Sequence, residues 1–146
     1  MAETLPGGVG FLISNSNFQI IVAGCNKIEV HTLLEAELEA IRVGFYFAIE
    51  NHFHIDFVFT NSIAAWQAIN QEFCDKFGGS NTRSLRFYIS SLRYMCNHWK
   101  HTMGLELLAY RLVAKGRSSH DLSLFHKGMD LPKWLMKDCN RLGFYF

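Results

Sequence analysis

The sequence predicts a single layered α/β domain, in which helices pack against β-strands. The chain has 146 residues, within the roughly 100–200 expected for one domain. Hydrophobic residues make up 49% and charged residues 18%, which excludes a disordered chain. Strand-like and helix-like runs alternate in the order β-β-α-β-α-α-β-α, an order typical of layered α/β or α+β domains.

The chain opens with a predicted β-hairpin. Gly7-Gly8-Val9-Gly10 leads into an apolar run that reaches residue 13, and a second apolar run covers residues 18–25. The polar residues between them, 14–17, predict a turn. Both runs are apolar on successive residues, so we expect both faces of the hairpin to be covered.

A long helix is predicted from near Thr32 to Asn51, because apolar side chains recur at steps of three and four residues. The members of this stripe are Leu34, Leu38, Ile41, Phe45 and Ile49. The apolar residues 55–60 predict a central strand. Asn61-Ser62 then provides side chains that can cap the start of another helix.

The second half of the chain is interpreted by the same signals. The predicted elements are a loop at 78–81, a helix at 85–96, a strand at 105–113 and a last helix from Ser118 or Ser119 to Gly128. We expect one domain over residues 1–146, with its core at about residues 7–128 and a C-terminal tail at 129–146. Only two prolines occur in the chain, so no proline-rich linker divides it.

Charge is distributed unevenly along the chain. The net charge of +1 excludes a strongly basic protein. Residues 1–75 carry two basic and nine acidic side chains, whereas residues 76–146 carry twelve basic and four acidic ones. This asymmetry indicates a polyanionic partner for the second half. The alternative, that the two halves neutralise each other across the folded domain, stays open.

The cysteine pattern indicates a reducing compartment. Cys25, Cys74, Cys96 and Cys139 lie far apart and form no C-x-x-C pair. The N-terminus lacks a signal-peptide pattern, and no apolar stretch approaches the ~20 residues of a membrane helix. We therefore expect an intracellular protein, nuclear or cytoplasmic, with no membrane partner.

Several stretches, in their order and spacing, resemble the plant ribonuclease H-like domain, a relative of the ribonuclease H of retroelement reverse transcriptases. They are GGVGFLISNSNFQIIVAG at 7–24, LEAELEAIRVG at 34–44, FVFTNS at 57–62, HDLSLF at 120–125 and the tail at 131–146. The resemblance implies a mixed sheet of five strands flanked by helices. It also implies Mg²⁺-dependent cleavage of the RNA strand of an RNA–DNA hybrid by two carboxylate-bound ions.

Carried over residue by residue, the resemblance implies an incomplete set of carboxylates. Glu37 occupies the position of the first-helix glutamate and Asp121 that of the last-helix aspartate, and these two would bind any metal. Asn61 stands where the family has an aspartate. Only six residues precede Gly7, too few for the family's first strand and its aspartate. We therefore expect Mg²⁺ to be weakly bound or absent.

Each of these candidates also has a structural explanation. Glu37 lies one position from the apolar stripe and is alternatively a boundary residue that reaches solvent. Ser118 to Asp121 fits the S-x-x-[DE] capping box at a helix start. Asn61 fits a helix N-cap. These alternatives stay open at the level of sequence.

The sequence thus predicts a degenerate ribonuclease H-like domain that binds nucleic acid, RNA or an RNA–DNA hybrid, with lost or very weak hydrolysis. The candidate phosphate contacts are Arg83, Arg86, Arg93, Lys115 and Arg117. One alternative is a pseudo-enzyme that serves as a protein-interaction module. Another is a retained Mg²⁺-dependent hybrid ribonuclease.

The missing first strand carries a prediction of its own. In the fold that the chain resembles, this strand lies between the hairpin and the strand at 55–60. Its absence would leave backbone N–H and C=O groups without partners in the middle of the sheet, which is costly when they are buried. We expect residues 7–13 to pair directly with residues 55–60. A strand lent by another chain, as in a strand-lending dimer, and a longer product are the alternatives.

Overall fold

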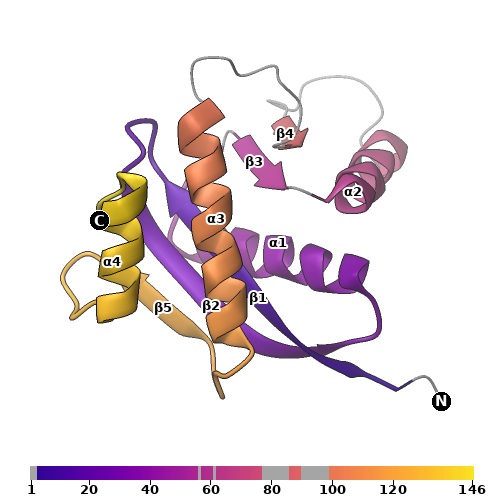
Figure 1. Ribbon diagram of the computed structural model, residues 1–146. Coiled ribbons are helices and arrows are strands. Elements are labelled where there is room, and N and C mark those ends of the chain that lie inside the picture. Colours follow the sequence, from indigo (N-terminus) through magenta and orange to yellow (C-terminus); the bar gives the residue numbers. More distant parts are fainter. Residues whose placement is uncertain (1–2, 56, 61, 77–85, 90–98) are drawn as a thin grey trace.

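The computed structural model describes residues 3–55, 57–60, 62–76, 86–89 and 99–146 (Figure 1). Its elements, in order, are β1 (Leu5–Ser14), β2 (Ile20–Val30), α1 (Leu33–Glu50), β3 (Phe57–Thr60), α2 (Ile63–Lys76), β4 (Arg86–Ile89), α3 (Trp99–Gly116), β5 (Ser123–His126) and α4 (Lys133–Leu142). This mixed α/β architecture agrees with the predicted class. None of the helices in the described ranges is long and apolar enough to cross a membrane.

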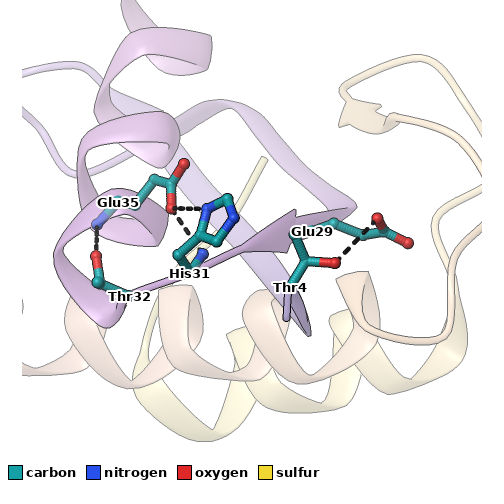
Figure 2. Close-up of polar contacts among 5 residues, drawn as sticks. All are labelled: Thr4, Glu29, His31, Thr32 and Glu35. Atoms are coloured by element: carbon teal, nitrogen blue, oxygen red, sulfur yellow. Dashed lines mark hydrogen bonds and ion pairs between the residues drawn. The ribbon is translucent and has the colours of Figure 1, made fainter. Parts of the chain in front are cut away.

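The predicted hairpin is confirmed. β1 and β2 pair antiparallel from Leu5 opposite Val30 to Ser14 opposite Ile20. The turn between them is held by Asn15, whose Oδ1 accepts the backbone N–H groups of two residues further along, each at 3.0 Å. At the other end, Figure 2 shows the Thr4 hydroxyl donating to a carboxylate oxygen of Glu29 at 3.4 Å. The two strands are therefore tied together along their whole length.

Helices cover both faces of the hairpin, as the continuous apolar runs predict (Figure 1). Successive side chains of a strand point to opposite faces. Gly8 and Gly10 face α3, whereas Phe11 faces α1, where its ring lies 6.3 Å from that of Phe47. On the α3 side, Leu108 is fully buried.

The glycines of β1 allow α3 to approach the sheet backbone to backbone. A Cβ atom built on Gly10 would lie 2.7 Å from the backbone nitrogen of Val113 and 2.8 Å from the carbonyl oxygen of Ala109. A Cβ atom on Gly116 of α3 would lie 2.5 Å from the carbonyl oxygen of Asn26 in β2. Contacts this short are not tolerated, so the position of α3 depends on these residues being glycine.

The core extends past residue 128, where the sequence placed its end. α4 and the residues after it contribute three buried side chains, Leu135, Cys139 and Phe144, to the main apolar cluster. The Phe144 ring fills the space beside Gly104, where a Cβ atom would lie only 2.7 Å from it. Residues 129–146 are therefore part of the folded core and not an appended tail.

Several secondary-structure predictions for the second half are wrong. Residues 105–113, predicted as a strand, lie inside α3; Leu105, Leu108 and Leu112 have helical spacing and form its inner face. The predicted last helix at 118–128 is replaced by turns and β5, which pairs antiparallel with Val22–Cys25 of β2. In the predicted helix at 85–96, residues 86–89 form β4, and the rest lies outside the described residues.

The described strands form two separate sheets. One has the order β1-β2-β5, and in the other β3 pairs with β4 in parallel. The predicted direct pairing of residues 7–13 with residues 55–60 is therefore wrong. The physical reason is that β3 has its described partner in β4, while the register of β1 with β2 occupies only one edge of β1. Among the described residues, β2 alone pairs with β1, which leaves β1 at the edge of its sheet.

Candidate functional site

The start of α1 is fixed by a set of polar contacts that Figure 2 shows together. Thr32 is the N-cap residue, and its hydroxyl oxygen accepts the backbone N–H of Glu35 at 3.1 Å. The Glu35 carboxylate accepts the backbone N–H of His31 at 2.7 Å and lies 3.3 Å from its Nδ1. The donated backbone N–H is the main reason that the pKa of Glu35 is lowered. These hydrogen bonds satisfy backbone N–H groups at the N-terminal end of α1 and fix where the helix begins.

Glu37 lies two residues after Glu35 on α1, and its side chain is half-buried. Burial, first of all, and then the negative charge of Glu106 raise the pKa of Glu37. Desolvation disfavours the ionised carboxylate, and a second carboxylate nearby disfavours it further. Glu37 therefore lies at the boundary between the core and solvent, a position that fits both interpretations of the sequence.

Glu106 of α3 is the carboxylate that the sequence interpretation missed. It is half-buried, and its charge reaches Glu37 on the helix that covers the other face of β1. The apolar run at residues 105–113 predicts a strand, and in a strand Glu106 is simply the one charged residue before Arg111. The spacing of Leu105, Leu108 and Leu112 would have identified a helix that carries this glutamate at its side.

Asp121, the predicted partner of Glu37, does not lie at the start of a helix. It is exposed, in the turn region between α3 and β5. The predicted capping box does not form, because no helix follows. Instead the hydroxyl groups of Ser118 and Ser119 donate to the carbonyl oxygen of Lys115, at 3.0 and 3.2 Å, and cap the C-terminal end of α3.

Asn61 lies outside the described residues, so its predicted place in the site has no structural counterpart here. Its neighbour Ser62 has the predicted capping role. The Ser62 hydroxyl oxygen accepts the backbone N–H of Ala65 at 3.1 Å, in the first turn of α2.

The five predicted phosphate contacts are only partly described. Arg83 and Arg93 lie outside the described residues, and Arg86 is described only as a backbone position in β4. Lys115 and Arg117 are exposed, at and just beyond the end of α3. The structure therefore brings two of the five together in one region.

Among the described residues, the candidate metal ligands of the site are the two glutamates Glu37 and Glu106. Mg²⁺ prefers oxygen ligands and is often held through one or two carboxylates with its remaining ligands from water. Glu37 and Glu106 have this chemistry. Within the described ranges, no group of three or more His, Cys, Asp or Glu side chains is placed to hold a metal ion. Two carboxylates are fewer than a site for two ions requires.

With this geometry in place, comparison with known proteins identifies the family. A model of the reverse transcriptase-like family matches residues 2–102, more than half of the chain. The chain belongs to the reverse transcriptase-like family. No curated protein and no solved structure matches it.

Membership of the reverse transcriptase-like family is consistent with a retroelement-type ribonuclease H-like domain, as the resemblance in the sequence implies. The match includes the hairpin, α1 with Glu37, and Asn61. It ends at residue 102, so Glu106, β5 and α4 lie beyond it. The part of the chain that carries most of the exposed basic residues described here is therefore not covered by the family match.

Proposed function

We propose that this reverse transcriptase-like domain binds nucleic acid, RNA or an RNA–DNA hybrid, and that it hydrolyses the bound strand very weakly or not at all. The observation that carries the proposal is that the negative charge of Glu106 on α3 adds to burial in raising the pKa of Glu37 on α1. Asn61 has an amide at the position where the resemblance implies another carboxylate.

The electrostatics of the pair support weak hydrolysis. A site that holds two divalent ions needs enough ionised carboxylates to offset their charge. Here burial and the charge of Glu106 raise the pKa of Glu37 and so oppose its ionised form. A Mg²⁺ ion held by Glu37 and Glu106 would have to offset this cost of ionisation. A bound Mg²⁺ would supply Lewis-acid stabilisation of a phosphoryl oxygen.

Basic residues support binding. The second half of the chain carries twelve of the fourteen lysines and arginines, and Lys115 and Arg117 are exposed at the end of α3. Phosphate contacts of this kind give affinity without sequence preference and make it dependent on salt. Nucleic-acid binding therefore needs no intact hydrolytic site.

The test measures binding and cleavage with the same labelled RNA–DNA hybrid. We expect a rise in fluorescence anisotropy at low salt, while a denaturing gel shows intact RNA after incubation with Mg²⁺ or Mn²⁺. Strong cleavage that is lost in both Glu37→Gln and Glu106→Gln would show a retained hybrid ribonuclease. Glu39→Gln is the matched control, because Glu39 lies on the same helix and pairs with Arg42 instead.

A second candidate function, a protein-interaction module, is favoured by the position of β1. This ten-residue strand lies at the edge of its sheet and pairs, among the described strands, with β2 alone. An edge of this length can accept an added strand through backbone hydrogen bonds. Addition of a strand from a second copy predicts a concentration-dependent dimer by light scattering, with β1 amides protected from hydrogen exchange. A monomer at all concentrations contradicts a strand-lending dimer.

A further inference from the structure

Helices α3 and α4 lie side by side on one face of the sheet, and Figure 1 shows them together in front of β2 and β5. Contacts between the two helices occur at two levels. Arg111 of α3 meets Asp138 of α4, and Lys115, one turn further along α3, meets Trp134, one turn earlier on α4. The helices therefore run in opposite directions with polar side chains along their junction.

Asp138 organises the first level. Its side chain is only 12% exposed, and its two carboxylate oxygens lie 3.6 Å from Nε of Arg111 and 3.8 Å from Nη2 of Arg141. The two arginine side chains are 54% and 59% exposed. A nearly buried carboxylate thus lies at ion-pair distance from two guanidinium groups whose side chains are more than half exposed.

Trp134 organises the second level. The ammonium group of Lys115 lies 5.3 Å from the centre of the Trp134 ring, a cation–π contact. The same ring packs edge-on against Phe125 of β5, with the ring centres 6.0 Å apart. Trp134 therefore positions the ammonium group of Lys115, and among the described residues no ion pair joins it to a carboxylate.

The outer side of α4 extends this basic surface. Lys133, Lys137 and Arg141 are exposed and recur every four residues, which places them along one side of the helix. Within the described ranges, neither lysine has a carboxylate at ion-pair distance. We call the set the α3–α4 basic seam; its members are Arg111, Lys115, Lys133, Lys137 and Arg141. Asp138 is the one carboxylate that the ion pairs place within it.

We propose that the α3–α4 basic seam binds the phosphate backbone of a polynucleotide strand. The inference rests on the proposed function and names the surface at which the nucleic acid would bind. From residue 133 to residue 141, α4 rises by about 12 Å, a length over which one nucleic-acid strand carries about three to four phosphates. A row of cations on this scale matches successive phosphates along a strand better than a single phosphate ion. The seam lies beyond the residues that match the reverse transcriptase-like family.

The test uses the full chain and a labelled single-stranded RNA, with binding followed by anisotropy over a range of salt concentrations. The seam variant is Lys115→Gln with Lys137→Gln, which leaves the Asp138 ion pairs intact. The control variant is Lys27→Gln with Arg42→Gln, which makes the same change in net charge at exposed positions of β2 and α1. Thermal melting of each variant shows that the fold is kept.

We expect the seam variant to bind about tenfold more weakly than wild type and its salt dependence to fall by about 1.4 in log–log slope, roughly 0.7 for each lost phosphate contact. The control variant should stay within about twofold of wild type. If wild type binds and the seam variant binds equally well, the seam is wrong and the proposed function stands. If wild type binds neither RNA nor hybrid at low salt, the proposed function fails and the seam fails with it.

Discussion

The two sides of α3 differ sharply in charge. On one side Glu106 lies near Glu37 of α1, and burial together with mutual repulsion raises the pKa of Glu37. On the other side Arg111 and Lys115 face α4, where an acid and an aromatic ring hold their cationic groups in place. Glu106 and Arg111 are five residues apart, which separates them by about 140° around the helix.

This difference in charge between the two sides of α3 indicates which side suits a polyanion. A phosphate backbone is attracted to the basic side and repelled by the paired carboxylates on the other. In an enzyme that cleaves the strand it binds, the carboxylates and the phosphate contacts must meet at one phosphodiester. Here α3 lies between them, an arrangement that supports the proposed binding without hydrolysis. The charge arrangement on both sides of α3 requires that this helix pack firmly against the sheet, so substitutions that weaken the packing should have the largest effects.

The largest effect is expected for Leu108→Ala. Leu108 is fully buried beneath α3 in the main apolar cluster, so truncation leaves a cavity and lowers the free energy of unfolding by about 2.5–5 kcal/mol. Chemical denaturation measures this change. Leu107→Ala is the matched control on the same helix, because Leu107 is half-exposed, and we expect less than about 1 kcal/mol there. Equal losses would show that α3 is not seated as described.

A smaller effect is expected for Gly10→Ala. The new Cβ atom would collide with the backbone of α3, and relief of the collision moves the helix off the sheet, at a cost of about 1–3 kcal/mol. Gly7→Ala provides the control on the same strand, since a Cβ atom there meets its nearest neighbour at an ordinary 3.5 Å. Thermal melting compares the two. A Gly10→Ala protein as stable as Gly7→Ala contradicts the close backbone packing.

The smallest effect, of opposite sign, is expected for Glu37→Gln. Because the folded-state pKa of Glu37 is raised, its ionised form destabilises the folded state. This destabilisation is absent below the ordinary pKa of glutamate, about 4.3, grows as the pH rises toward the folded-state pKa, and is complete above it. We expect the variant to melt roughly 1–3 °C higher than wild type at pH 7 and at the same temperature in acid.

Glu39→Gln is the control for the Glu37 prediction. Arg42 donates to its carboxylate and lowers the pKa of Glu39, so the ionised form stabilises the folded state. The substitution should therefore lower the melting temperature slightly at pH 7, and the difference should disappear as the pH falls through the lowered pKa. A shift of the same sign in both variants would contradict the electrostatic difference between the two glutamates.

Local patterns in the sequence predict the first half of the molecule well and the second half poorly. The hairpin is predicted by two continuous apolar runs around a polar turn, and α1 by an apolar repeat of three to four residues, and both elements form as predicted. Residues 105–113 were misassigned because short apolar runs do not distinguish a strand from a buried helix. β5 is only four residues long, and its pairing with β2 is a tertiary contact that no local signal specifies.

The candidate site shows the same limit. Glu37 is singled out by the family resemblance, at the position of the first-helix glutamate, and the structure places it half-buried on α1. Glu106 could not be identified in the same way, because its role depends on α3 being a helix and on the side of that helix on which Glu106 lies. The basic seam required knowing that residues 129–146 fold back onto the core, which brings Asp138 and Trp134 to α3.

Photo-cross-linking of a single-stranded RNA that contains 4-thiouridine, followed by mass spectrometry of the peptides and gel electrophoresis of the RNA, tests the central claim most directly. The claim is that a polynucleotide is held on the basic side of α3 and left intact. We expect cross-links in peptides covering residues 110–117 and 133–141, with full-length RNA recovered in the presence of Mg²⁺. Cross-links confined to α1 around Glu37, together with shortened RNA, would contradict it.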